Sequence, residues 1–328
     1  MDLRVKWILL FLALTTVYLP ADDGAASIAA GGIIMMKREP RITMAREVLR
    51  ISVRNVVVDY DFRNDSNQNI TTTVAFPVPM YPEDEARIDG PVFFDDFKLW
   101  INGSPAIYKI EASAFLNDKE YTQLLNEMHV NIATLGITNS NDSEPVDANR
   151  LPADQRKQLV DLGLIEKENG ETRWKVKKKY YWQQTFPAHK IVHIRHEYTP
   201  ATGGYATGLL SGIRDQDSSN ANDLMSFCIE GRLKTILQQA AKDDKSIDTG
   251  YAYVDFILTT ANTWKTPIED FTLIVEHANR EGAYTSFCWD GPVTKIDATH
   301  FSAHRHNFIP IKELRVGWFH LLKAGTDR

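Results

Sequence analysis

The 328-residue chain has only two cysteines and no long block of like charge. Its formal net charge of −6 is spread along the sequence, so there is no basic footprint of the kind that binds nucleic acid. The basic run Lys175 to Lys179 is a local exception, and its alternation with Val176 favours a solvated strand face over a polyanion site. With 43% hydrophobic residues, the chain can bury a core as one large domain or two of ordinary size.

The common signatures of enzymes are also missing. There is no G-x-S-x-G elbow, Walker A loop, G-x-G-x-x-G turn, H-E-x-x-H helix or C-x-x-C pair. The glycine-rich segment Gly203 to Gly208 lacks the lysine and spacing of a phosphate loop, and a flexible connection is expected there. Asp215 to Ser219 begins like a calcium loop, but Asn220 and Ser226 stand where glycine and glutamate are required. We therefore expect no cofactor, and the sequence leans against an enzyme.

Long apolar runs are absent except at the N-terminus. The run Trp7 to Leu19 follows Arg4 and Lys6 and is short for a bilayer span, so residues 1–21 are predicted to be a signal peptide. The mature chain then begins at Asp22, with a cut near Ala25 as a second option and an uncleaved anchor as the alternative. Since no later window reaches membrane-spanning length, we expect a periplasmic or secreted protein without a transmembrane segment after cleavage.

In an exported chain, an even pair of cysteines usually forms a disulfide. A bond between Cys228 and Cys288 would close a loop of about sixty residues and contribute ~4 kcal/mol of stability. The alternative is a pair of buried thiols.

Most of the remaining pattern has the two-residue period of β-strands. Leu49 to Pro79 contains two alternating runs around a polar turn at residues 64–69, and it predicts a hairpin with a bulge or corner near Arg54. Its second run ends at Pro77 and Pro79, which cannot donate to a ladder. Further hairpins are predicted over 93–112, turning at Asn102-Gly103, and over 171–198, turning near Pro187. Later strands are expected over 252–259, 271–275, 283–288 and 314–322.

Three segments change to a helical period. Asp118 is expected to cap a helix that runs through Met128, and a second helix begins near Pro152 and ends at Gly163. The third, over 229–240, has the clearest helical spacing.

The predicted fold is therefore mainly β, a β-rich α+β class with two sandwich-like antiparallel β units and helical insertions. We divide the mature chain into an N-terminal β-sandwich portion (22–112), a helical insertion (113–170) and a C-terminal β-rich portion with one helix (171–328).

Two groups of side chains are candidates for a site. His300, His304 and His306 share one strand parity, and three imidazoles on one face match the ligands of a catalytic zinc ion; half-exposed histidines on a sheet are the plainer interpretation. His189 and His193 form a second pair, with His196 on the other parity. The tryptophans are expected to pack in the core, with a carbohydrate-stacking platform as the alternative; they are Trp100, Trp174, Trp182, Trp264, Trp289 and Trp318.

Several short motifs, taken in order, resemble one known family. They are Gly31-Gly32, the run from Val56 to Pro79 ending AFPVP, HEYTP at 196–200, WKTPI at 264–268 and SFCWDG at 286–291. Together they are similar to the bacterial exported proteins catalogued as domain of unknown function 4424. The resemblance covers nearly the whole mature chain and implies a periplasmic or secreted β-rich protein with no assigned activity. It also supports pairing of Cys288 with Cys228. A fainter likeness, in the NDS turn and FPVP strand, is to the vault and inter-alpha-trypsin type of β-domain and concerns fold only.

We therefore expect a non-enzymatic binding or structural module of the bacterial cell envelope. Its partner would be an envelope protein or a glycan, bound through an exposed sheet edge or the helical insertion. The alternatives are a metal-dependent hydrolase that uses the three histidines, and a carbohydrate-binding module that uses exposed tryptophans.

Overall fold

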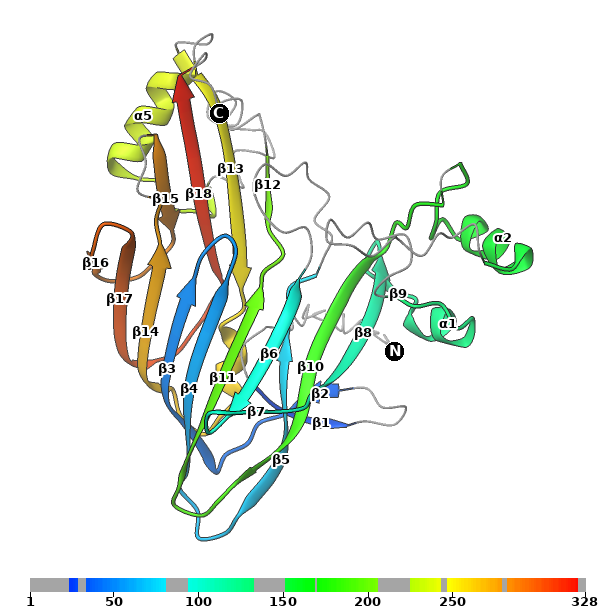
Figure 1. Ribbon diagram of the computed structural model, residues 1–328, viewed down its shortest axis with the longest axis horizontal. Helices are drawn as coiled ribbons and strands as arrows, with labels where there is room; N and C mark the ends of the chain where they lie inside the picture. Colours follow the sequence, from blue (N-terminus) through cyan, green and yellow to red (C-terminus); the bar gives the residue numbers. More distant parts are fainter. Residues whose placement is uncertain are drawn as a thin grey trace, which may run out of the picture.

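The computed structural model describes residues 24–28, 34–80, 94–132, 151–168, 170–205, 225–242, 247–278 and 282–323. The predictions for residues 1–21, for the polar loop at 139–149 and for the calcium-like segment at 215–220 lie outside these ranges. The described residues form three β-sheets with short helices at their margins (Figure 1). The mainly β class predicted from the sequence is confirmed.

The largest sheet has eight strands, in the order β16-β17-β14-β3-β4-β11-β6-β7. Its strands are β3 (Ile42–Ile51), β4 (Val56–Asn64), β6 (Asp95–Ile101), β7 (Ser104–Pro105), β11 (Ile191–Thr199), β14 (Ile268–Glu276), β16 (Val293–Lys295) and β17 (His300–Phe308). The pairing of β14 with β3 is parallel. This pairing places the N-terminal portion and the C-terminal portion in one continuous sheet.

A six-stranded sheet, in the order β2-β1-β5-β10-β8-β9, packs on the inner face of the first. It consists of β1 (Gly24–Ile28), β2 (Ile34–Met36), β5 (Ile70–Pro77), β8 (Lys109–Leu116), β9 (Lys119–Glu120) and β10 (Lys175–Phe186). Aromatic side chains from both sheets meet in the layer between them, among them Phe76 of β5 and Phe97 of β6, whose ring centroids are 5.6 Å apart. The two sheets therefore form a sandwich, as Figure 1 shows.

The third sheet, in the order β12-β13-β18-β15, extends the molecule away from the sandwich (Figure 1). Its strands are β12 (Gly203–Tyr205), β13 (Ile247–Phe256), β15 (Ala283–Phe287) and β18 (Leu314–Lys323). The helix α5 (Gly231–Lys242) contributes Leu233 and Leu237 to a small core with Phe227 and Phe319. Cys228 and Cys288 form a disulfide, which confirms the predicted pairing and ties the start of α5 to the end of β15.

The predicted hairpins are in the right places, but their strands pair differently. After residues 64–69 the chain leaves the eight-stranded sheet, so β5 pairs with β1 and β10 instead of β4. The connection near Pro187 makes the same crossing, because β10 and β11 belong to opposite sheets. The turn at Asn102-Gly103 is confirmed, yet its return strand β7 has only two residues and β8 crosses to the other sheet.

Side-chain hydrogen bonds explain why the first connection is an arch. The amide nitrogen of Asn64 donates to the carbonyl oxygens of Gln68 and Phe186, both at 2.8 Å. The buried amide thus joins the end of β4 to the end of β10 across the sandwich. Alternation correctly predicted which side chains are buried, but it cannot distinguish a hairpin from an arch because both reverse the chain.

Helices α1 and α2 are shorter than their predicted spans, whereas α5 has the predicted length and begins two residues later than expected. Helix α1 (Thr122–Glu127) is preceded by Tyr121, and Asp118 lies in the turn between β8 and β9 with a φ of 63°, so the prediction that Asp118 caps this helix was wrong. Helix α2 (Ala153–Asp161) follows Pro152 and ends before Gly163, whose φ is 69°. A 3-10 turn, η2 (Thr259–Thr263), precedes β14. Within the described residues, none of the helices has the length and hydrophobicity needed to cross a membrane.

Candidate functional site

The outer face of the eight-stranded sheet carries a row of alternating charges. On β4, Tyr60 and Phe62 point into the core, so Asp59 and Asp61 point outward on the opposite face. Backbone register then aligns Asp59 with Arg195 of β11, and Arg195 with Trp100 of β6. We call the outward side chains of this region the charged band; they are Arg46, Arg50, Asp59, Asp61, Trp100, His193 and Arg195.

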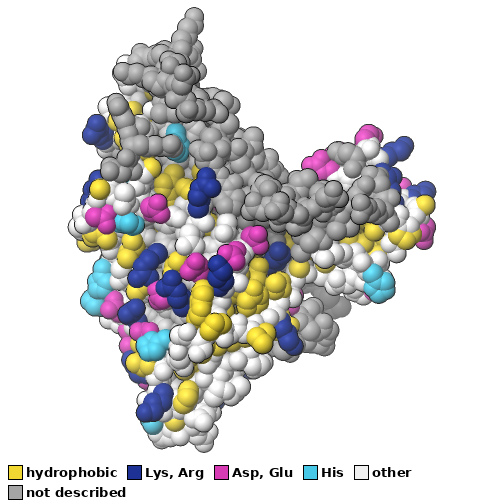
Figure 2. Space-filling model, in the orientation of Figure 1, with side chains coloured by type: hydrophobic (Ala, Val, Ile, Leu, Met, Phe, Trp, Pro, Cys, Tyr) yellow, Lys and Arg dark blue, Asp and Glu magenta, His cyan; other side chains and the backbone are white. Residues whose placement is uncertain are grey.

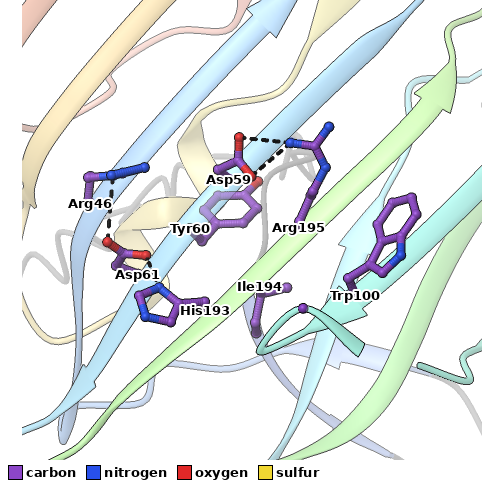
Figure 3. Close-up of a pocket in the computed structure, with 9 residues that line it drawn as sticks. Arg46, Asp59, Tyr60, Asp61, Trp100, His193, Ile194 and Arg195 are labelled. Carbon is purple, nitrogen blue, oxygen red and sulfur yellow. Dashed lines mark hydrogen bonds and ion pairs between the residues drawn. The ribbon is translucent and has the colours of Figure 1, made fainter. Parts of the chain in front are cut away.

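The carboxylates of the charged band are each held by two basic groups, and Figure 3 shows these groups except Arg50. Asp61 lies 2.6 Å from Nδ1 of His193 and 3.6 Å from Nε of Arg46. Asp59 accepts hydrogen bonds from Nη1 of Arg50 at 2.6 Å and from Nη1 of Arg195 at 3.1 and 3.2 Å. These pairs fix the side chains in place across three neighbouring strands.

A shallow hollow of about 330 Å³ lies on the charged band. Its walls include the two carboxylates, Arg46, Arg195, His193 and one face of Trp100. The side chains of Asp59 and Asp61 are 26% and 20% exposed, whereas those of Arg195 and His193 are 42% and 63% exposed. The carboxylates therefore form the floor of the hollow and the basic groups form its rim.

Trp100 gives one end of the hollow an apolar wall. The guanidinium carbon of Arg195 lies 5.9 Å from its ring centroid, and Pro105 is its partner on β7. Ile107, which is 93% exposed, follows this short strand. Figure 2 shows the resulting arrangement, with basic and acidic side chains across the middle of this face and hydrophobic side chains beside them.

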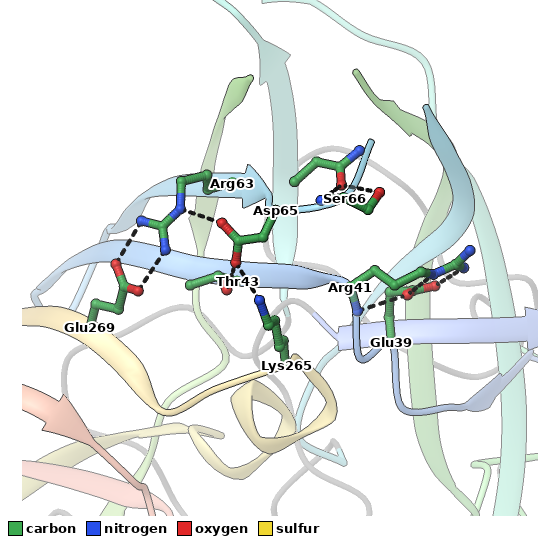
Figure 4. Close-up of polar contacts among 9 residues, drawn as sticks. Glu39, Arg41, Thr43, Arg63, Asp65, Ser66, Lys265 and Glu269 are labelled. Carbon is green, nitrogen blue, oxygen red and sulfur yellow. Dashed lines mark hydrogen bonds and ion pairs between the residues drawn. The ribbon is translucent and has the colours of Figure 1, made fainter. Parts of the chain in front are cut away.

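A second ionic network closes the end of the same sheet (Figure 4). Arg63 forms a bidentate salt bridge with Glu269, with hydrogen bonds of 2.7 and 2.8 Å, and donates a third hydrogen bond to Asp65 at 2.6 Å. Asp65 also accepts hydrogen bonds from Lys265 and Thr43. Burial would by itself raise the pKa of Asp65, but the hydrogen bonds from Lys265, Arg63 and Thr43 hold it well below its usual value. This network joins β3, β4, β14 and the chain just before β14, which is a structural role.

The three histidines predicted as metal ligands do not come together as a set. His304 and His306 lie side by side, with ring centroids 4.5 Å apart. His300 lies at the far end of β17 and pairs with Asp297 at 2.9 Å. Asp270 of β14 takes its place beside the other two, since Asp270 is the cross-strand partner of His306.

The other predicted groups are dispersed. His193 belongs to the charged band, whereas His189 contacts Asn67 and His196 is fully buried among the rings of Tyr60, Phe76, Phe97 and Trp182. Core packing is confirmed for four tryptophans, Trp174, Trp182, Trp264 and Trp318. Trp100 and Trp289 are partly exposed.

The basic run on β10 is not a fully solvated face. Lys179 is buried, with its side chain 10% exposed, and it donates to Glu111 of β8 at 2.5 Å. The prediction of a solvated strand face was wrong for this residue. Because β10 is an interior strand, it is flanked on both sides, and the neighbouring strand supplies the matching carboxylate.

The family model for "Domain of unknown function (DUF4424)" matches residues 21–316. The chain belongs to this family. The match confirms the resemblance seen in the sequence motifs and includes every residue of the charged band. No curated protein matches the sequence.

Several solved structures are distantly similar. A Legionella pneumophila protein described as a candidate nutrient-binding protein has 15% identity and a TM-score of 0.39, with 86% of this chain and 68% of that chain covered. An M1 zinc metallopeptidase from Deinococcus radiodurans has 7% identity and a TM-score of 0.26, with 86% and 43% covered. We draw no functional conclusion from either likeness.

Most of the charged band was not predicted from the sequence. Trp100 and His193 were among the candidates, but the alternating acids of β4 and the basic residues of β3 and β11 were not recognised as one surface. The available signal was the pattern Asp-Tyr-Asp at 59–61 together with His-Ile-Arg at 193–195, in which charged residues occupy one parity of strands whose other parity is apolar.

Proposed function

We propose that this protein is an exported, non-enzymatic binding module of the bacterial cell envelope, and that it binds a neutral glycan in the hollow that lies on the charged band. The observation that carries the proposal is the composition of the hollow, in which two carboxylates, two guanidinium groups and an indole face lie together.

The mixture of charges selects the ligand class. An anionic ligand would meet the carboxylates of Asp59 and Asp61 at the floor of the hollow, and a cationic ligand would meet the guanidinium groups of Arg46 and Arg195. A neutral sugar is repelled by neither set of charges, and each of its hydroxyl groups can donate to a carboxylate and accept from an arginine.

The indole of Trp100 adds the second requirement of a sugar site. One face of a pyranose ring consists of C–H groups, and a flat aromatic side chain offers them an apolar surface. Pro105 and the exposed Ile107 extend this apolar surface beyond the hollow, which suits an oligosaccharide longer than one ring.

Two features support the proposed location. The N-terminal run Trp7 to Leu19 has the length and charge order of a signal peptide, and disulfides such as Cys228–Cys288 persist mainly in oxidising compartments. We favour the charged band over a sheet edge or the helical insertion as the binding surface because it combines a concave shape with polar groups that converge on one point.

Calorimetric titration of the mature chain tests the proposal. The probes are chitotetraose, a neutral oligomer of N-acetylglucosamine, and maltotetraose. We expect one of them to bind, and we expect Trp100→Ala and Arg195→Ala each to weaken binding about tenfold, which corresponds to ~1.4 kcal/mol. Arg50→Ala is the matched control, since Arg50 also pairs with Asp59 but does not line the hollow.

Binding that survives both lining variants, or no binding of either neutral oligomer, would contradict the proposal. Equal losses in the lining variants and in Arg50→Ala would show that the variants act through the sheet and would also count against it. Binding of a zwitterionic amino acid at the same residues would support the charged band as the binding surface but would contradict a glycan as its ligand.

A further inference from the structure

The outer face of the same sheet places three potential metal ligands together at its other edge. They are Asp270 on β14 and His304 and His306 on β17, and one ligand atom of each lies within 4.8 Å of the others. Nε2 of His304 is 2.5 Å from Oδ1 of Asp270. Figure 2 shows histidine side chains on the edge of the sheet that β17 occupies.

The sheet itself brings these side chains to one point. Residues two apart on a strand share a face, so His304 and His306 both point outward. Asp270 is the direct cross-strand partner of His306, and Thr272 is the partner of His304. The carboxylate of Asp270 therefore reaches both imidazoles from the neighbouring strand, and His300, four residues away on β17, lies too far along the strand to join them.

We propose that Asp270, His304 and His306 bind a divalent transition metal of the zinc type. Two imidazole nitrogens and one carboxylate oxygen form the donor set that leaves coordination positions open for water or a ligand. In tetrahedral zinc sites the ligand atoms lie roughly 3.3 Å from one another, given metal–ligand bonds of about 2.0–2.2 Å. The present spacing, from 2.5 Å up to 4.8 Å, reaches this geometry if side-chain rotations change the distances between the ligand atoms by about 0.8 to 1.5 Å.

The surroundings leave room for these rotations and for an open position. The side chains of His304 and Asp270 are 47% and 44% exposed, so small movements do not disturb the core. His306 also lines a hollow of about 470 Å³ with Trp289, Phe308 and Arg305. The guanidinium of Arg305 is paired with Asp290 at 2.9 Å, so it does not sit on the metal position. The metal position itself is open to solvent on the outer face of the sheet, where His304 and His306 are exposed.

The register links the metal position to the charged band, although neither proposal depends on the other. Thr272 is aligned with Val48, Val48 with Asp59, and Asp59 with Arg195. Since His304 is the partner of Thr272, it lies on the same row of the sheet as Asp59 and Arg195, about three strands or ~15 Å from Asp59.

Equilibrium dialysis of the full mature chain against zinc chloride, after treatment with a chelator, tests the metal site. We expect one zinc ion per chain. We expect His304→Ala, His306→Ala and Asp270→Asn each to weaken zinc binding by roughly 100-fold or more. Mutation of residues that only hydrogen-bond to metal ligands already lowers metal affinity by 10–100-fold, and loss of a ligand should cost at least as much. His300→Ala is the matched control, since His300 lies on the same face of the same strand and pairs with its own aspartate.

Cobalt provides a second, spectroscopic readout that reports the coordination of the metal. Co²⁺ added in place of zinc should give a visible absorption band that is present in the wild type and in His300→Ala and absent in the three ligand variants. Thermal melting of each variant without metal should match the wild type, because the substituted side chains are outside the core.

The inference is overturned if zinc does not bind stoichiometrically, or if binding is unchanged in the ligand variants. Loss of zinc binding in His300→Ala as well would place the ion elsewhere on β17 and would also overturn it.

Discussion

His196 makes the stability of the fold depend on pH in a way that one substitution can remove. Its imidazole is fully buried between the two sheets and is surrounded by the aromatic rings of Tyr60, Phe76, Phe97 and Trp182. Burial lowers the pKa of His196 to about 3, from its usual value of 6.5. In the folded protein the ring is therefore neutral at every pH above about 3.

The sign and size of the effect follow from these two values. Between pH 6.5 and about 3, the unfolded chain takes up a proton at His196 that the folded chain does not, so acid favours the unfolded chain. The contribution is complete above pH 6.5 and falls by about 1.4 kcal/mol for each pH unit below it. From pH 7 to pH 4.5 the loss is ~3 kcal/mol, which is a large part of the 5–15 kcal/mol that typically separates folded from unfolded protein.

The variant His196→Phe replaces the imidazole by a ring that does not titrate and suits the aromatic surroundings. Urea unfolding at pH 7, 6, 5.5 and 4.5 measures the free energy of unfolding of both proteins. We expect the wild type to lose ~3 kcal/mol more than the variant over this range, whatever their difference at pH 7. The control His129→Asn changes an exposed histidine with a positive φ of 56°, a backbone conformation that asparagine tolerates, and should keep the wild-type slope. Parallel pH profiles for wild type and His196→Phe would show that His196 does not cause the loss of stability in acid.

Two further predictions concern the parts that hold the sheets together. Asp65→Asn removes the charge that Arg63 and Lys265 share, so it should cost about 1–3 kcal/mol by urea unfolding at pH 7. Since the pKa of Asp65 is lowered in the folded state, this difference should shrink as the pH falls below about 4, and a difference as large at pH 2 as at pH 7 would contradict the role of the charge. Replacing both Cys228 and Cys288 by serine should lower the free energy of unfolding by ~4 kcal/mol, as expected for a closed loop of this length. An unchanged midpoint in the doubly substituted chain would show that the bond does not contribute.

The local features of the fold could be predicted from sequence because they depend on nearest neighbours. The alternation of Val58, Tyr60 and Phe62 reports one buried face, and the buried residues of β4 are the ones it indicates. Asn102-Gly103 forms a turn because both residues adopt a positive φ.

The strand pairings could not be predicted in this way. Whether β5 returns beside β4 or crosses to the opposite sheet depends on the buried amide of Asn64 reaching Phe186, which is 122 residues away in the sequence. The burial of Lys179 could not be predicted for the same reason, since its partner Glu111 comes from a strand that the alternation of β10 does not reveal.

In the candidate sites, too, the features that depend on one strand could be predicted, and those that depend on strand pairing could not. Parity along one strand correctly placed His304 and His306 on one face, but it also grouped them with His300, because parity does not measure distance along the strand. Asp270 could only be found from the register between β14 and β17. The charged band likewise depends on the alignment of β4 with β11 and of β11 with β6, which no single segment of sequence specifies.

We proposed that the hollow on the charged band holds a neutral sugar against Trp100. A crystal structure of residues 22–328 with chitotetraose or maltotetraose, whichever binds more tightly, gives the decisive measurement. We expect a sugar ring stacked on the indole of Trp100, with ring hydroxyls within hydrogen-bond distance of Arg195 and Asp59. A sugar bound elsewhere on the molecule, with the charged band empty, would rule this site out.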